Sequence, residues 1–374
     1  MHVIEYLKQH GLEKTKQDFF LETRDYPDRI VFNYTFDSPK HHPITKECRA
    51  LILSFPDWNV ISRAFDRFFN LEEDPDNKNF PFNDMLCLEK VDGSLIPLHN
   101  DGKQWQVATR GTAFAEGGTA WENGTFNKTF ERAVQANLLK IYPLMKKEDC
   151  LNKLFSMLDP VNNYIFELVS PETRVVHPYP NDDCFLLSVR NKLTGIELDW
   201  ENVKKVSKTI GIKTPKEYTF RTIEECVESS KALPTMDEGY VCVARRQDGT
   251  FWRIKVKNPA YLAISNLRCN GALSIKRIAI LVFADRGEEY LTYFAEDKPI
   301  FLPYIEAYEK MLAAIKELEP LLPMENQKDF AMKVKDTPVG SIMFSLRKGK
   351  VLKEILDSMN ENVKESILTK FTKK

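Results

Sequence analysis

The pattern of apolar residues changes once along this chain, near residue 260. Between residues 29 and 110, short apolar runs alternate with turn signals such as Asp92-Gly93, a pattern typical of antiparallel strands. After Pro259, runs such as "PYIEAYEKMLAAIKELEPLL" have the period of helices and no strand alternation. The sequence therefore predicts an α+β protein of two domains. Residues 1–259 are expected to hold antiparallel sheets with flanking helices, and residues 260–374 an all-helical domain.

Local patterns predict further elements in the first domain. We expect an amphipathic helix from residue 1 to about residue 22, and helical segments near 126–157, 200–210 and 221–232. Strands are expected at "NYIFELVS" and "CFLLSVR". The domain is expected to end in the hairpin "EGYVCVARRQDGTFWRIKVK", with its turn at Gln247-Asp248-Gly249.

The charge balance restricts how this chain could contact a nucleic acid. Its 374 residues include 53 Lys and Arg and 54 Asp and Glu, so any such contact requires local basic patches. Arg347-Lys348-Gly349-Lys350 and the terminal "KFTKK" are candidate patches, and a solvated face is the alternative for each. No apolar run approaches ~18 residues, which predicts no membrane span. The N-terminal segment is too charged for a signal peptide.

Cysteine and histidine usage gives no sign of a metal centre. Seven cysteines are scattered without a Cys-x-x-Cys pair, which argues against structural zinc and against a disulfide framework. Cys87, Cys184 and Cys242 lie in apolar runs and are expected to be core residues in a reducing cytosol. The histidines, including His41-His42, His99 and His177, lack metal-binding spacing and are interpreted as structural or solvated.

Charged residues stand in several strand-like runs of the first domain. Lys90 precedes Asp92-Gly93 and is either solvated beside a hairpin bend or a nucleophile. Glu167 lies in an apolar strand and needs a partner, for which Arg190 is one candidate. Glu238-Gly239 opens a strand, where a surface acid is the simple interpretation. Lys255 and Lys257 share one strand face and either are solvated or converge on phosphate.

The order of these pieces carries more information than any one of them. Lys-x-Asp-Gly, an apolar strand with Glu, Glu-Gly at a strand start and a closing Lys-x-Lys resemble the covalent nucleotidyltransferase superfamily of ATP-dependent ligases and mRNA capping enzymes. "ECRALIL", "SRAFDRFFNLEE", "TRGT", "IKVKNPAY" and the tail "QKDFAMKVKDTPVGSIMFSL" further resemble the phage RNA ligase 1 family. These are the T4-type RNA ligases, which repair broken tRNA anticodon loops. The likeness covers most of the chain.

This resemblance implies a fold and an activity. The first domain would be a nucleotidyltransferase domain and the helical domain would confer RNA or tRNA specificity. A lysine takes AMP from ATP, passes it to an RNA 5′-phosphate, and a 3′-hydroxyl then displaces it. Expected cofactors are ATP and Mg²⁺, with Mn²⁺ as a substitute. The expected partners are single-stranded RNA ends or a broken tRNA anticodon loop, and an end-healing kinase-phosphatase. The expected location is the host cytoplasm of a bacteriophage.

The resemblance also implies site residues. Lys90 is the nucleophile, Glu238 a metal carboxylate, and Asp92 a metal contact through water. Glu288-Glu289 is either a second metal contact or a solvated acidic turn. Tyr34 and Tyr261 match aromatics near the nucleotide, and core packing is the alternative. Motif residues beside the site are Phe69, Asn70 and Gly239. The expected ATP-binding residues are Tyr34, Arg49, Arg67, Lys90, Gly93, Arg110, Glu167, Lys255 and Lys257.

Some positions depart from the family pattern. Arg67 and Arg110 stand where lysine is common, which keeps the charge and changes the geometry. Val91 replaces a glutamate found in many relatives. The nucleophile must lose a proton that a free lysine holds up to a pKa near ~10.4. We expect burial and nearby cations, Lys255 and Lys257 among them, to lower the pKa of Lys90.

Two alternatives remain for the function. A DNA ligase or capping guanylyltransferase would place a β-rich OB-fold after the Lys-x-Lys strand, whereas a helical pattern follows it here. A catalytically dead relative that only binds RNA would have no need of Lys90, Glu167, Glu238, Lys255 and Lys257 together.

Overall fold

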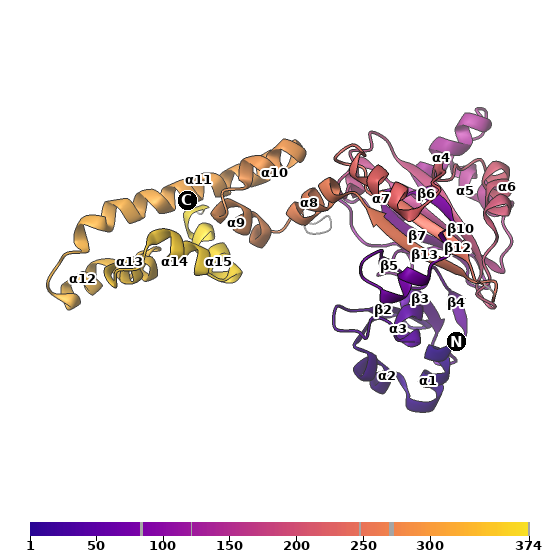
Figure 1. Cartoon of the computed structure of the whole chain (residues 1–374), viewed down its shortest axis with the longest axis horizontal. Helices are drawn as coiled ribbons and strands as arrows, with labels where there is room; N and C mark the ends of the chain where they lie inside the picture. Colours follow the sequence, from indigo (N-terminus) through magenta and orange to yellow (C-terminus); the bar gives the residue numbers. More distant parts are fainter. Residues whose placement is uncertain (83–84, 121, 247, 269–272, 373–374) are drawn as a thin grey trace. The chain divides into compact units, whose positions relative to one another are not determined.

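The computed structural model describes residues 1–82, 85–120, 122–246, 248–268 and 273–372. The chain divides into two compact units, Met1–Leu262 and Ala263–Lys374. All strands belong to the first unit, and the described part of the second unit contains helices (Figure 1). The predicted α+β class is confirmed, and helix α8 (Pro259–Arg268) contains the point at which the two units meet in the sequence.

The first unit contains three sheets. Their strand orders are β1-β2-β3-β4, β10-β9-β7-β8 and β11-β6-β12-β13-β5. The strands pair antiparallel, apart from the parallel pair of β5 and β13. The strands are β1 (Leu21–Asp25), β2 (Arg29–Tyr34), β3 (Arg49–Ser54), β4 (Val60–Ser62), β5 (Phe69–Asn70), β6 (Leu86–Glu89), β7 (Ser94–Asn100), β8 (Trp105–Val107), β9 (Asn162–Val169), β10 (Asp183–Asn191), β11 (Glu217–Tyr218), β12 (Gly239–Arg245) and β13 (Phe251–Lys257).

Side chains that cap helix N-termini mark several helix starts. Thr125, Asp199 and Thr222 accept hydrogen bonds from the first turns of α4, α6 and α7. The helices of the first unit are α1 (His2–His10), α2 (Leu12–Phe19), α3 (Pro43–Glu47), α4 (Phe126–Ile141), α5 (Cys150–Phe155), α6 (Trp200–Ile210) and α7 (Ile223–Lys231). After α8 come α9 (Ile275–Phe283), α10 (Gly287–Tyr293), α11 (Lys298–Leu318), α12 (Gln327–Val334), α13 (Gly340–Arg347), α14 (Leu352–Ser358) and α15 (Glu361–Thr372).

One predicted element needs correction, another is confirmed, and some of the residues named in the sequence analysis lie outside the described ones. The single helix expected from residue 1 to about residue 22 is wrong, because Gly11 adopts φ 79° and ends α1 before α2 begins. The predicted closing hairpin is confirmed as the antiparallel pair β12 and β13. Gln247 of its turn, Cys269 and the last two residues of "KFTKK" lie outside the described residues.

The β10-β9-β7-β8 sheet and the five-stranded sheet of the first unit are each covered by helical structure on one face. Helices α4, α5 and α6 share a hydrophobic core with the β10-β9-β7-β8 sheet, around Phe130, Leu138 and Phe166. Helix α7 packs on the sheet that contains β6, β12 and β13. Side chains alternate between the two faces of a strand. The opposite faces of both sheets are therefore free to form a site, and their residues line one cavity, described below.

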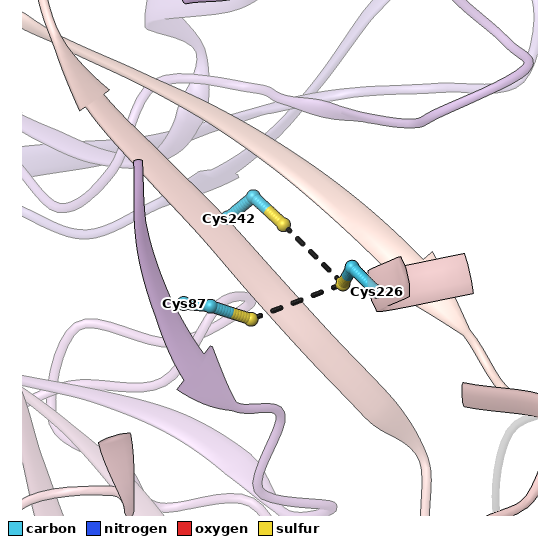
Figure 2. Close-up of side chains that lie close together, drawn as sticks. All are labelled: Cys87, Cys226 and Cys242. Carbon is cyan, nitrogen blue, oxygen red and sulfur yellow. Dashed lines mark hydrogen bonds between the residues drawn. The ribbon is translucent and has the colours of Figure 1, made fainter. Parts of the chain in front are cut away.

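Cys87 of β6, Cys226 of α7 and Cys242 of β12 lie close together in the core, although they come from separate segments of the sequence (Figure 2). The Sγ atom of Cys226 lies 3.9 Å from that of Cys87 and 3.8 Å from that of Cys242. These separations resemble the ~3.8 Å edges of a tetrahedral thiolate site. However, no histidine or carboxylate joins the group in the described part of the chain. Three thiolates around a divalent ion would leave net charge in an apolar cluster, which is costly. We therefore assign them to the core.

The second unit forms its own core. Helices α9, α11 and α15 pack together, and Tyr290, Phe294 and Phe301 are fully buried. Buried Asp297 accepts a hydrogen bond from the Tyr290 hydroxyl at 2.5 Å, so the phenol is satisfied inside this core. Among the described helices of the whole chain, none combines the length and the apolar composition needed to cross a bilayer.

Candidate active site

A cavity of about 290 Å³ lies between the β10-β9-β7-β8 sheet and the five-stranded sheet of the first unit. Both charged and apolar side chains line the cavity. The charged residues are Arg49, Glu89, Lys90, Glu167, Glu238, Arg253, Lys255 and Lys257. The apolar residues include Phe65, Phe68, Leu86, Leu88, Leu187, Leu198, Trp200, Val203, Val241 and Val243.

Strand pairing brings Lys90, Glu238 and Lys257 to one edge of a sheet. Lys90 follows β6, and its backbone N–H donates to the Gly239 carbonyl at 2.8 Å. Gly239 lies opposite Lys257 in the β12–β13 register. The Oε2 atom of Glu238 lies 2.7 Å from Lys90 Nζ, and its Oε1 atom lies 2.9 Å from Lys257 Nζ. Glu238 is buried, so the interpretation of Glu238 as a surface acid is wrong.

The proton on Lys90 is held more firmly than the sequence suggested. Burial lowers the pKa of Lys90, but the carboxylates of Glu238 and Glu167 outweigh it, so the pKa lies above its ordinary value. The expected lowering is therefore wrong. The lysine with the lowered pKa is Lys255, at about 7, because it is buried and faces Arg49, Lys90 and Lys257.

Arg49 and Lys255 are cations without a carboxylate partner among the described residues. Their charged groups lie 5.0 Å and 4.8 Å from the centroid of the Phe68 ring. The Nη1 atom of Arg49 is buried and has no hydrogen-bond acceptor in that part of the chain. Buried donors of this kind are costly unless a ligand satisfies them. The part of the cavity beside Arg49 and Lys255 therefore suits an anion.

Glu167 enters the cavity from the other sheet. Burial raises the pKa of its carboxyl group to about 7, against the opposing effect of Lys90. The alternative partner Arg190 is wrong, because Arg190 pairs with Asp66 at 3.0 Å. Gly93 has a definite role here: a Cβ at this position would lie 2.4 Å from the Leu168 carbonyl oxygen and 3.0 Å from Glu167 Cγ. The absence of a side chain at Gly93 thus allows β9, which carries Glu167, to pack closely against the Gly93 backbone.

Asp92 forms hydrogen bonds with two segments that are distant from it in the sequence. Its Oδ2 atom accepts hydrogen bonds from the backbone N–H groups of Val176 and His177, at 2.8 and 2.7 Å. Its Oδ1 atom accepts from the Tyr261 hydroxyl at 2.7 Å. Burial and the charge of Glu238 raise the pKa of Asp92. Protein donors thus already occupy both oxygens, and Tyr261 is a buried residue hydrogen-bonded to Asp92. These contacts favour an anchoring role for both residues.

Tyr34, Arg67 and Arg110 form a separate stack beside Arg49. The guanidinium carbons of Arg67 and Arg110 lie 3.9 and 4.5 Å from the Tyr34 ring centroid. After burial, which has the larger effect, the charge of Arg110 contributes to the lowered pKa of Arg49. None of the three lines the main cavity. Their expected contact with ATP therefore stays a prediction.

The remaining predicted residues lie at varied distances from the chemistry. Asn70 of β5 pairs with Lys255, whereas Phe69 lines a second cavity and not the main one. Gly239 adopts φ 132°, and a Cβ there would lie 2.2 Å from the Val256 carbonyl oxygen. Glu288 and Glu289 lie in the exposed first turn of α10 in the second unit, where Glu289 pairs with Arg286 at 2.8 Å. Their metal role stays a prediction.

Sequence reasoning missed two features of the cavity. Phe68, which separates the cations Arg49 and Lys255, was visible only as part of "FFN". The ion pair of Arg253 and Glu197, with Nη1 and Oε1 at 3.0 Å, was not expected. Arg253 lies two residues before Lys255 on the same strand face, and this spacing was the available signal.

The histidines have structural contacts. The His42 Nδ1 atom accepts from the Ile44 N–H at 3.3 Å, and His177 lies 3.1 Å from Asp237. Burial lowers the pKa of His99 to about 3. In the second unit, Arg347 donates to the Met324 carbonyl at 2.6 Å, whereas Lys348 and Lys350 are exposed.

A family model described as RNA ligase, of the T4 type, matches residues 47–261 of this chain. The chain belongs to the T4-type RNA ligase family. The matched segment of this chain includes Arg49, Lys90, Glu167, Glu238 and Lys255.

Curated relatives have corresponding names. A protein of Autographa californica nuclear polyhedrosis virus, named as a candidate bifunctional polynucleotide kinase/RNA ligase, is 29% identical over 82% of this chain. The match spans only 44% of that relative's length. An RNA ligase of Rhodothermus phage RM378 is 26% identical, over 89% of this chain and 90% of the relative.

Solved structures of similar proteins are more distant. An archaeal ATP-dependent RNA ligase covers 76% of this chain and 68% of its own, with 13% identity and a TM-score of 0.43. A Naegleria gruberi RNA ligase mutant with ATP and Mn covers 50% of this chain and 52% of its own, with 14% identity and a TM-score of 0.37.

Proposed function

We propose that this chain is an ATP-dependent RNA ligase that joins RNA 5′-phosphate and 3′-hydroxyl ends through lysyl-AMP and RNA-adenylate intermediates. The observation that carries the proposal is the position of Lys90. Its amine is held by Glu238 in a cavity in which, among the described residues, Arg49 and Lys255 have no carboxylate partner. The family membership of residues 47–261 supports the same activity.

The cavity offers both the apolar and the charged contacts that ATP requires. The aliphatic residues Leu86, Leu88, Val241 and Val243 come from adjacent strands and would cover the faces of a base. Arg49 and Lys255 would hold phosphate oxygens, which would satisfy the buried Arg49 donor. A carboxyl group at the Glu167 position would accept from ribose hydroxyls. These residue types fit a nucleoside triphosphate.

The chemistry needs a neutral amine at Lys90. Nζ of Lys90 would form a bond to the α-phosphorus of ATP as the bond to pyrophosphate breaks. A Mg²⁺ ion near Glu238 would compensate the carboxylate charge that now raises the pKa of Lys90, and would offset charge on the phosphate oxygens. Arg49 and Lys255 would stabilise the negative charge that develops on the transferred phosphoryl group.

We also propose that RNA ends of the kind found in a broken anticodon loop are substrates. The relative named as a bifunctional polynucleotide kinase/RNA ligase supports a kinase, on the same or another chain, that prepares the 5′-phosphate. Capping chemistry is the second candidate within the superfamily. The helical second unit favours the RNA ligase, because capping enzymes place a β-rich domain there.

A joining assay tests the proposal. The protein is incubated with Mg²⁺, a 5′-phosphorylated single-stranded RNA that also carries a 3′-hydroxyl, and either ATP or GTP. We expect circular and dimeric products with ATP only, and none with RNA that lacks the 5′-phosphate. Products that depend on GTP, or no product with ATP while the protein remains folded, would contradict it. Comparison of nicked hairpin-loop, single-stranded and duplex RNA identifies the preferred substrate.

A further inference from the structure

A second cavity, of about 230 Å³, shares part of its wall with the nucleotide cavity. Phe68, Phe251 and Arg253 line both. The family resemblance names only Arg67 and Phe69 among the other residues of this wall, so most of the wall has no assigned role. Its outer part is formed by Trp252 and Arg246, at the end of the β12–β13 hairpin. Its inner part contains Phe69.

Cations lie over aromatic rings around the second cavity. Lys46 Nζ lies 5.8 Å from the Phe69 ring centroid, and the guanidinium carbon of Arg67 lies 5.2 Å from the same centroid. The guanidinium carbon of Arg246 lies 4.8 Å from the Trp252 ring centroid. Aromatic faces and adjacent cations are the elements with which proteins bind single-stranded nucleic acid, because bases stack on the rings and phosphates meet the cations.

The charges in this wall are unevenly compensated. Arg253 pairs with Glu197, and Arg190 pairs with Asp66. In contrast, Lys46, Arg67 and Arg246 have no ion pair within 4.0 Å in the part of the chain that the structure describes. The Nη1 atom of Arg67 is buried and has no acceptor there.

Two further carboxylates of the wall already have other contacts. Asp74 lies 3.4 Å from His41, and Asp248 accepts from Thr250 at 2.6 and 2.9 Å. Among the described residues, Lys46, Arg67 and Arg246 are therefore the cations of this wall without a direct carboxylate partner.

We propose that the second cavity binds the RNA strand that carries the 5′-phosphate, with a base against Trp252 and backbone phosphates at Arg246 and Lys46. This inference rests on the proposed ligase function. The wall shared through Phe68 and Arg253 connects the cavity to the place where AMP would be transferred. The buried Nη1 donor of half-buried Arg67, which has no acceptor among the described residues, suits a terminal phosphate, whereas a 3′-hydroxyl end offers no such charge.

The test compares Arg246→Glu with Arg245→Glu. Both arginines are exposed neighbours in the same hairpin, but only Arg246 lines the cavity, so the two variants change the net charge equally. Lysyl-AMP formation is measured first. Transfer of AMP to a 5′-phosphorylated single-stranded RNA is then measured against RNA concentration at several salt concentrations. A Trp252→Leu variant, checked by thermal melting because Trp252 also packs on Phe80, tests base stacking.

For Arg246→Glu we expect lysyl-AMP formation to stay within about twofold of the wild type. The RNA concentration for half-maximal transfer should rise about tenfold, with a weaker dependence on salt. Arg245→Glu should change that concentration less than about twofold. Equal effects of the two variants, or a defect confined to binding of the 3′-hydroxyl strand, would overturn the inference. A wild-type protein that forms no lysyl-AMP would instead overturn the proposed function, so the two failures are distinguishable.

Discussion

Lys90 and Glu238 form an ion pair of 2.7 Å at the edge where β6 and β12 meet. The carboxylate positions the amine, and it also keeps the amine protonated, because it raises the pKa of Lys90. Lys255 has the opposite property, with a pKa of about 7, although it lies in the same cavity. The protein therefore holds one lysine in position by an ion pair and keeps the pKa of another closer to neutrality.

This difference predicts distinct reactivities for the two amines. Acylation of Lys255 by an amine-specific reagent should follow a pH curve with its midpoint near 7, since its folded-state pKa is about 7 and lies below the usual 10.5. The midpoint of the curve for Lys90 should lie above pH 10.5, because its pKa is raised. Peptide mass spectrometry across a pH series measures both curves, each normalised to its own plateau. Coincident curves would contradict the assigned electrostatics.

Glu167 predicts discrimination between ATP and its deoxyribose analogue. If its carboxyl group accepts from a ribose hydroxyl, loss of that hydroxyl should raise the KM for adenylylation about tenfold, the value of one hydrogen bond to a charged group. In Glu167→Ala the ratio of the two KM values should fall to about one. A ratio that stays at the wild-type value in Glu167→Ala would show that Glu167 does not contact the ribose.

The close packing around Gly93 predicts that one added methyl group at this position strongly lowers the stability of the fold. Gly93→Ala places a Cβ 2.4 Å from a backbone oxygen of β9, so strands must separate. We expect a loss of about 2–4 kcal/mol in the free energy of unfolding, measured by urea denaturation. Gly111→Ala is the matched control, because nothing lies within 4 Å of its added Cβ. Equal stability of the two variants would mean that β9 is not packed as described.

A variant of Asp92 distinguishes an anchoring role of this residue from a metal-binding role. Asp92→Asn replaces one acceptor oxygen by a donor that faces either Tyr261 or the 176–177 backbone, so unfolding should become easier by about 1–3 kcal/mol. Tyr261→Phe should cost a similar amount, and the double variant should cost less than the sum. An Asp92→Asn protein of unchanged stability that needs much more Mg²⁺ would instead identify a metal contact.

The sequence predicted the parts of this protein that depend on local patterns. Strand alternation and turn residues located β6, β7, β12 and β13, and the Lys-x-Lys spacing correctly placed Lys255 and Lys257 on one face. The order of motifs then identified the family that the comparison shows. These features need no knowledge of which strands become neighbours.

What the sequence did not predict depends on contacts between distant segments. The sign of the Lys90 pKa shift depends on how close Glu238 and Glu167 come relative to the cations. The meeting of Cys226 with Cys87 and Cys242 depends on where α7 packs, so an argument from Cys-x-x-Cys spacing could not detect it. The two anchoring bonds to the 176–177 backbone similarly join Asp92 to a segment more than eighty residues away.

The position of covalently bound AMP tests the central claim most directly. The protein is incubated with α-labelled ATP and Mg²⁺, denatured and digested, and the modified peptide is sequenced by mass spectrometry. The account predicts AMP on Lys90 through an acid-labile phosphoramidate, with no label in Lys90→Ala and full label in the exposed control Lys103→Ala. AMP on Lys255, the amine with the lower pKa, or label retained by Lys90→Ala would contradict it.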